Sequence, residues 1–110
     1  MEQCVFCKIA KGEIHKDFEY QDEDIMVFKD ISPIRPVHHL IVPKKHVKEI
    51  AVADPKLVQK LFSVVQKMIL QTKLENKGYR LTLNGGGAQV IDHLHIHLTG
   101  PMGKKAGWLY

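Results

Sequence analysis

The chain has 110 residues, enough for one domain with a modest hydrophobic core, and we expect a single domain over residues 1–110. Hydrophobic residues make up 45% of the chain, and no apolar run reaches the length of a membrane span or resembles a secretion signal, which predicts a soluble, cytoplasmic protein. The formal charge of +4 comes from scattered lysines and arginines, so the composition argues against nucleic-acid binding and fits attraction of small phosphorylated ligands.

The first half of the chain predicts a short helix and three strands. Residues 4–11 carry apolar side chains on one helical side and are followed by a glycine, which favours a short helix. Residues 18–21 and 25–29 are strand candidates joined by a polar turn, which predicts a hairpin. A third strand is expected over residues 38–42, where Pro43 stops it.

The second half predicts one long helix and two strands. Asp54 and Pro55 form a helix start, and the apolar residues that follow recur every three or four positions until about Gly78. A fourth strand is expected over residues 79–83, and residues 84–87 form a glycine-rich loop. Strands joined by short turns beside a single long helix argue for an antiparallel α+β fold.

Residues 93–98 alternate imidazole and apolar side chains, a period of two that is typical of a strand with two unlike faces. His93, His95 and His97 would share one face, which places three groups that titrate near neutrality on one patch. Such a patch suits a metal, a phosphate, or a nucleophile with helper groups. The alternative is a chance run of surface histidines.

Two other segments can meet this patch. His38 joins it if the strand over residues 38–42 lies beside the histidine strand, although a structural polar role is the alternative. The Gly85–Gly87 loop allows its backbone N–H groups to approach an anion closely, and its alternative is a plain flexible turn.

Several blocks of the chain, taken together and in order, resemble the histidine triad (HIT) family, in its Hint branch of nucleotide-binding proteins. The resemblance covers nearly the whole chain, so the single domain is expected to be a HIT domain. The blocks are residues 6–9, 12–14, 28–33, 40–46 and 76–80, together with the triad itself.

This resemblance implies a five-stranded antiparallel sheet with one long helix and a short N-terminal helix. It also implies a hydrolase of purine nucleoside 5′-phosphoramidates or related nucleotidyl conjugates, which acts at the α-phosphate without a catalytic metal. By matching position, His95 is the nucleophile that forms a covalent nucleotidyl-histidine, and His97 contacts the phosphate. His38, as a supporting histidine, and His93 complete the catalytic set.

The resemblance further implies a nucleotide pocket. Asp30 would bind the ribose hydroxyls, and Phe28 and Ile31 would line the base pocket. Asn84 and Gln89 would touch the phosphate or the sugar.

The chain departs from the family pattern at three places before the triad. Val90 stands where the family has a hydroxyl residue that helps the phosphate and the leaving group, so we expect weaker turnover of substrates that lose an amine. Asp92 takes a position often held by an aromatic residue, and no role follows from it. The loop from Asn84 to the triad is shorter than in relatives, which weakens the transfer of family contacts onto residues 85–88.

Cys4 and Cys7 form a C-x-x-C pair near the N-terminus. No thioredoxin-like βαβ pattern surrounds the pair, but a redox pair and two free thiols remain alternatives to a metal site. In zinc-binding members of the family, such cysteines join the histidines that match His46 and His93. Two cysteines and two histidines form a complete tetrahedral set, so the resemblance implies a structural zinc.

A second class of function is a nucleotide-binding sensor or scaffold with little turnover, which Val90 favours. The family also implies a homodimer, in which the long helix and a strand pair across a two-fold axis. Trp108 would then lie near the active site of the partner subunit, with a disordered tail as the alternative.

Overall fold

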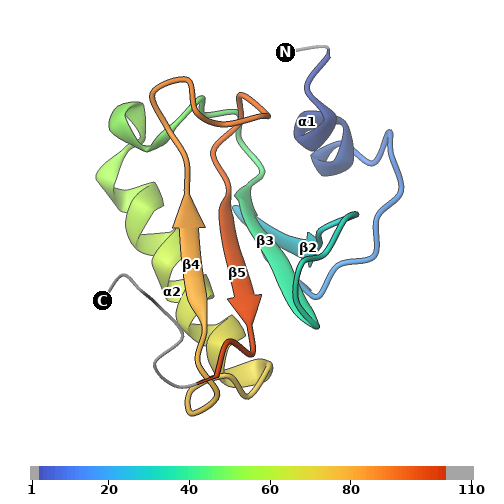
Figure 1. The fold of residues 1–110 in the computed structure, drawn as a ribbon. Helices are drawn as coiled ribbons and strands as arrows, with labels where there is room; N and C mark the ends of the chain where they lie inside the picture. Colours follow the sequence, from blue (N-terminus) through green and yellow to red (C-terminus); the bar gives the residue numbers. More distant parts are fainter. Residues whose placement is uncertain (1–2, 104–110) are drawn as a thin grey trace.

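A five-stranded antiparallel sheet with the strand order β1-β2-β3-β5-β4 forms the centre of the fold (Figure 1). The computed structural model describes residues 3–103, so Trp108 lies outside the described residues. The elements are α1 (Val5–Ala10), β1 (Tyr20–Gln21), β2 (Ile25–Lys29), β3 (Val37–Pro43), a 3₁₀ helix (Ile50–Val52), α2 (Pro55–Gln71), β4 (Arg80–Leu83) and β5 (Ile96–Gly100). The predicted α+β fold, with one long and one short N-terminal helix, is confirmed.

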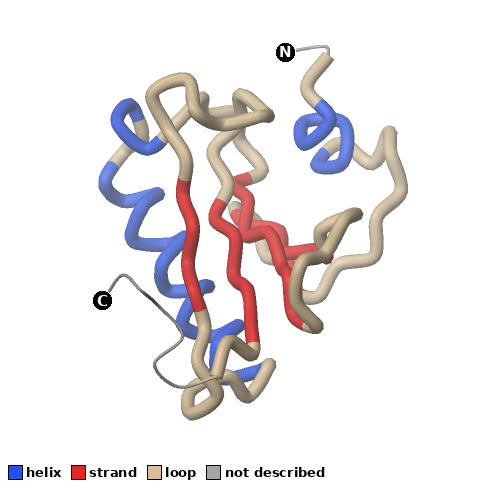
Figure 2. The backbone as a smooth tube through the Cα atoms, viewed as in Figure 1, coloured by secondary structure: helices blue, strands red, loops and turns tan. Residues whose placement is uncertain are grey.

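The two helices lie on different sides of the strands (Figure 2). One face of the sheet packs against α2 through a core that includes Ile41, Leu98 and Met68. The other face packs against α1 through Phe28 and Phe6. Adjacent residues of the central strands therefore serve two different cores, and functional side chains on the α1 face are separated from the main core under α2.

The long helix begins where the sequence predicts but ends earlier. Asp54 accepts a hydrogen bond from the Lys56 N–H at 2.8 Å, and Pro55 takes the first helical position. The helix ends at Gln71 rather than near Gly78, because Lys73 adopts a left-handed conformation with φ of 60°. Leu74 continues the apolar spacing of the sequence, but it lies beyond the end of the helix, where it is buried.

The histidine strand begins and ends later than predicted, since it covers Ile96–Gly100 rather than residues 93–98. β5 begins at Ile96, so His93 and His95 precede it and make no ladder pairs. Partner strand β3 ends at Pro43, and its last pairing with β5 joins Ile41 to Ile96. The backbone before β5 bends instead, with the His93 N–H donating to the Ile91 carbonyl at 2.8 Å. This bend sends the side chains of the triad to two different places.

Other boundaries differ by a few residues. β1 covers only Tyr20–Gln21, and the fourth strand starts at Arg80 rather than at position 79. The 3₁₀ helix at Ile50–Val52 has no clear sequence signal. None of the helices in the described residues is long and apolar enough to cross a membrane.

Candidate active site

A cavity of about 660 Å³ opens on the α1 face of the sheet. Its walls come from α1, the end of β2 with the loop that follows, the loop before the triad, and β5. The predicted nucleotide-pocket residues that line it are Phe28, Asp30, Ile31, Asn84 and Val90, and the triad contributes His95 and His97. Phe6 of α1 also lines it, although the sequence did not predict a role for Phe6 in the site.

His95 is held in one tautomer by the backbone. Its Nδ1 lies 2.8 Å from the carbonyl oxygen of His93. A carbonyl only accepts, so Nδ1 donates its proton to it, and in the neutral ring Nε2 keeps its lone pair. The ring is 7% exposed and packs edge-on against Phe6 at a centroid distance of 5.2 Å. His95 therefore presents an unprotonated nitrogen in a site where packing fixes the plane of the ring.

His38 and His97 form a second pair of imidazoles. β3 and β5 are neighbours, as the prediction for His38 required, and Nε2 of His38 lies 2.9 Å from Nδ1 of His97. Burial, together with the neighbouring rings of His95 and His38, lowers the pKa of His97 below its usual range. His97 is thus kept uncharged near neutral pH.

Asp30 lies beside this pair at the end of β2. Its Oδ1 accepts the Ser32 N–H at 2.8 Å, while Oδ2 lies 3.4 Å from Nε2 of His38 and 3.9 Å from Nδ1 of His97. An ionised carboxylate offers about four acceptor positions, so Asp30 retains capacity for hydroxyl groups of a ligand.

The glycine-rich loop is held by side chains that the sequence reading did not assign to it. The Gly86 N–H donates to Glu49 at 3.1 Å, and the Gly87 N–H donates to Oε1 of Gln89 at 3.0 Å. Nε2 of Gln89 donates in turn to the Lys48 carbonyl at 3.4 Å. These two N–H groups are therefore satisfied within the protein, contrary to the expectation that the loop offers them to an anion. Gln89 is buried and is absent from the cavity lining.

The HIT domain family matches residues 11–103 of this chain. The chain is a member of the HIT family. Among curated relatives, Protein HitA of Neisseria gonorrhoeae is 38% identical over 105 residues, which cover 91% of this chain and 97% of HitA. A HIT family hydrolase from Legionella pneumophila Philadelphia 1 has a TM-score of 0.84 at 38% identity and covers 96% of this chain and 100% of its own. A HIT family hydrolase from Clostridium thermocellum has a TM-score of 0.86 at 37% identity and covers 97% of this chain and 96% of its own.

This HIT domain also contains a compact cluster of metal-binding residue types. Cys4, Cys7, His46 and His93 each direct one ligand atom into a space where all four atoms lie within 4.8 Å of one another. Sγ of Cys4 is 3.3 Å from Nδ1 of His93, and Sγ of Cys7 is 3.3 Å from Nδ1 of His46 and 3.6 Å from that of His93. Tetrahedral zinc with its usual bond lengths would set sulfur and nitrogen ligands about 3.6 Å apart.

The protonation of His93 suits a metal as well. Nε2 of His93 lies 2.7 Å from the Pro43 carbonyl and so donates its proton there, which leaves the lone pair on Nδ1 facing the two sulfurs. Burial lowers the pKa of His93 to about 4, so the ring stays neutral. Burial, followed by the side-chain hydrogen bond that the Cys7 thiol makes to Cys4, raises the pKa of that thiol, so its thiolate requires a compensating cation. The residues fit a metal such as zinc.

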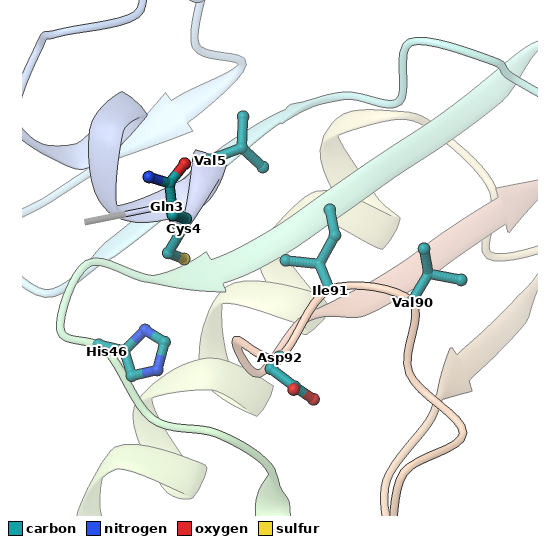
Figure 3. Close-up of a pocket in the computed structure, with 7 residues that line it drawn as sticks. All are labelled: Gln3, Cys4, Val5, His46, Val90, Ile91 and Asp92. Atoms are coloured by element: carbon teal, nitrogen blue, oxygen red, sulfur yellow. The ribbon is translucent and has the colours of Figure 1, made fainter. Parts of the chain in front are cut away.

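A smaller cavity of about 390 Å³ lies beside this cluster (Figure 3). Cys4 and His46 border it on one side, and Val90, Ile91 and Asp92 border it on another. Asp92 is exposed and is absent from the group of four ligand atoms. The triad is thus divided between two sites, since His93 belongs to the cysteine cluster while His95 and His97 face the larger cavity.

Proposed function

We propose that this HIT domain, of the Hint type, hydrolyses purine nucleoside 5′-phosphoramidates or related nucleotidyl conjugates through a covalent nucleotidyl-His95 intermediate. The observation that carries the proposal is the tautomer of His95. Its Nδ1 proton is committed to the His93 carbonyl, so the lone pair of Nε2 is available at a cavity whose volume suits a nucleotide. Solved relatives from Legionella pneumophila and Clostridium thermocellum are described as HIT family hydrolases.

The reaction proceeds in two displacements at phosphorus. In the first, Nε2 of His95 attacks the α-phosphorus, the bond from phosphorus to the leaving nitrogen breaks, and the departing amine takes up a proton from the solvent. In the second, water attacks the same phosphorus and returns a proton to the solvent, the bond to Nε2 breaks, and the nucleoside monophosphate leaves. His97 donates a hydrogen bond to the phosphoryl oxygens, where negative charge develops, and His38 supports His97.

The nucleotide is held by the walls of the same cavity. Phe28 and Ile31 contact the base, and Asp30 accepts hydrogen bonds from the ribose hydroxyls. Asn84 lies on the cavity wall, where it can reach the phosphate or the sugar. Gln89 would join them only after giving up its hydrogen bond to the Gly87 N–H or to the Lys48 carbonyl.

The test is a direct search for the intermediate. The purified chain is mixed with adenosine 5′-phosphoramidate and quenched at high pH, where a nucleotidyl-histidine survives, and the adduct is located by peptide mass spectrometry. We expect release of AMP and an adduct on His95. Binding of AMP with neither adduct nor turnover would instead favour the nucleotide sensor or scaffold, the second candidate that Val90 supports.

Substitution of Val90 by serine tests the departure from the family pattern. Val90 is 98% exposed at the cavity rim, so the change costs the fold little. A hydroxyl there can donate to the phosphate or the departing amine, and one such hydrogen bond predicts an increase in phosphoramidate turnover of about three- to tenfold. Val90→Ala is the matched control and should leave turnover near that of the native chain. Equal rates for the serine and alanine variants would contradict this role.

The metal in the cysteine cluster is proposed to be a structural zinc. Four protein ligands leave no open coordination position, so the ion would join α1 to the segments before β5 and after β3 without entering the reaction. Both cysteines are free thiols, and a reducing cytoplasmic setting would keep them available to the ion.

A homodimer is also proposed. β4 is an edge strand, and exposed apolar side chains lie on it and on α2, including Leu81, Phe62 and Leu70. Pairing of two β4 edges across a two-fold axis would cover this surface. Sedimentation velocity should show a dimer for the native chain and for Val52→Glu, an exposed control, but a shift toward monomer for Leu70→Glu. A native chain that sediments as a monomer would refute the assembly.

A further inference from the structure

The loop between β2 and β3 contacts His38, the histidine that supports His97, through its backbone. Ile34 in this loop has an exposed side chain and does not line the cavity. Its N–H nevertheless donates to Nδ1 of His38 at 3.2 Å. A backbone N–H can only donate, so Nδ1 of His38 must present a lone pair, and the ring proton of His38 lies on Nε2.

This proton position determines the next hydrogen bond. Nε2 of His38 lies 2.9 Å from Nδ1 of His97, and because it carries the proton, Nδ1 of His97 is the acceptor. His97 is kept uncharged by burial and by its neighbouring imidazoles, so it has one ring proton, which must lie on Nε2. The two hydrogen bonds therefore run in one direction, from the Ile34 amide through His38 to His97.

We propose that the backbone amide of Ile34 is a positioning group for nucleotidyl transfer, because it sets the tautomer of His97 through His38. The proposal rests on the proposed function for its chemical consequence. His97 then offers an N–H donor to the phosphoryl group while His95 offers a lone pair to phosphorus. The opposite tautomer would place lone pairs on the outer nitrogens of both rings, and the site would lose its donor.

A metal ion shared by Asp30, His38 and His97 is the competing explanation of this cluster, since one ligand atom of each lies within 4.8 Å of the others. A metal on Nε2 of His38 needs the lone pair there, which would move the proton to Nδ1. Two N–H donors would then face each other across the 3.2 Å contact with Ile34. The cysteine cluster differs in this respect. There Nε2 of His93 donates its proton to the Pro43 carbonyl, so Nδ1 has a lone pair for a metal.

Asp30 favours the same proton position as the amide. Its Oδ2 lies 3.4 Å from Nε2 of His38, and a carboxylate attracts the proton carried there. The test must therefore separate the contribution of the Ile34 amide from that of Asp30.

The native chain without nucleotide supplies the first test. Long-range nitrogen-15 NMR spectra report which ring nitrogen of each histidine is protonated, and couplings across N–H···N hydrogen bonds identify the partners. We expect a coupling from the Ile34 amide to Nδ1 of His38, a second from Nε2 of His38 to Nδ1 of His97, and the Nε2–H form of both rings. Absence of the first coupling, or a His97 ring protonated on Nδ1, would overturn the proposal.

Two variants at position 34 supply the second test. Ile34→Pro removes the N–H and extends an existing proline connection, whereas Ile34→Ala keeps the N–H and loses only the exposed side chain. We expect the proline variant to shift the tautomer ratio of His38 by about fivefold, as one lost hydrogen bond implies. Its rate of adduct formation should fall in proportion to the remaining Nε2–H form of His97, and the alanine variant should match the native chain in both measurements.

The outcomes separate the role of the Ile34 amide from the proposed function. Unchanged tautomers in Ile34→Pro would show that Asp30 is sufficient and would refute the role of the amide. A slower rate with unchanged tautomers would do the same, because it would reveal only a structural effect. If the proline variant does not fold, the couplings in the native chain still decide. A native chain that forms no nucleotidyl-His95 would refute the proposed function. Its spectra would still show whether the Ile34 amide sets the tautomers of His38 and His97.

Discussion

Replacement of His95 by asparagine is expected to abolish nucleotidyl transfer, with a loss of ~10³-fold or more in single-turnover rate. The asparagine amide can still donate to the His93 carbonyl, as Nδ1 of His95 does at 2.8 Å, but it has no nucleophilic nitrogen. The measurement is AMP formation from adenosine 5′-phosphoramidate with excess protein, together with a search for the protein adduct. AMP affinity should remain within a few-fold of the native value, because the residues proposed to hold the base and the ribose are unchanged.

His97→Asn is the matched comparison, since it changes the same residue type two positions away. It removes a hydrogen-bond donor to the phosphoryl group rather than the nucleophile, and we expect a loss of about 10²-fold with the adduct still detectable. The order of the two losses is therefore the informative result. An adduct on His95→Asn protein would show that another residue is attacked and would refute the assigned mechanism.

The sequence predicted the start of α2 correctly but not its end. The start of α2 follows from Asp54 and Pro55 alone, because an N-cap and a first-turn proline act within a few residues. The end of α2 could not be predicted in this way. Leu74 continues the apolar spacing, and only the left-handed conformation at Lys73 separates it from the helix.

In the candidate site, too, some features follow from neighbouring residues and others depend on residues far away in the sequence. Alternation in residues 93–98 indicated the strand and the chemistry of three imidazoles, but not that pairing begins at Ile96 or that the triad divides between two sites. Those features depend on long-range contacts that His93 makes with Cys4 and Pro43. The contact from Glu49 to the glycine-rich loop joins residues 37 positions apart, and no sequence pattern predicts it.

The second large effect is expected at the cysteine cluster. The native chain, prepared with zinc available, should contain about one zinc per chain by plasma mass spectrometry. Cys7→Ser should lose this zinc and several kcal/mol of unfolding free energy, because metal binding to a site that exists only in the folded state is folding free energy. Val5→Ala, a neighbouring change on α1 that leaves all four ligand residues in place, should keep the metal and most of the stability.

A chelator separates the metal from the packing of the side chain. Cys7 is 7% exposed, so its replacement also disturbs the interior, at a cost of about 1 kcal/mol. In urea unfolding with chelator present, the native chain and Cys7→Ser should therefore differ by only this smaller amount, whereas with zinc the difference should be several times larger. Absence of zinc from protein made with zinc available would refute the site.

Loss of the metal should also reach the active site. The cluster joins α1 to the segment before β5, and Phe6 of α1 packs edge-on against both His93 and His95, at 5.6 and 5.2 Å between ring centroids. Without the ion, the thiols and imidazoles hold α1 only by weak hydrogen bonds, so this wall of the cavity gains freedom. Turnover by Cys7→Ser should accordingly fall even at temperatures where the variant is folded, and AMP affinity should fall with it because the same wall lines the nucleotide pocket.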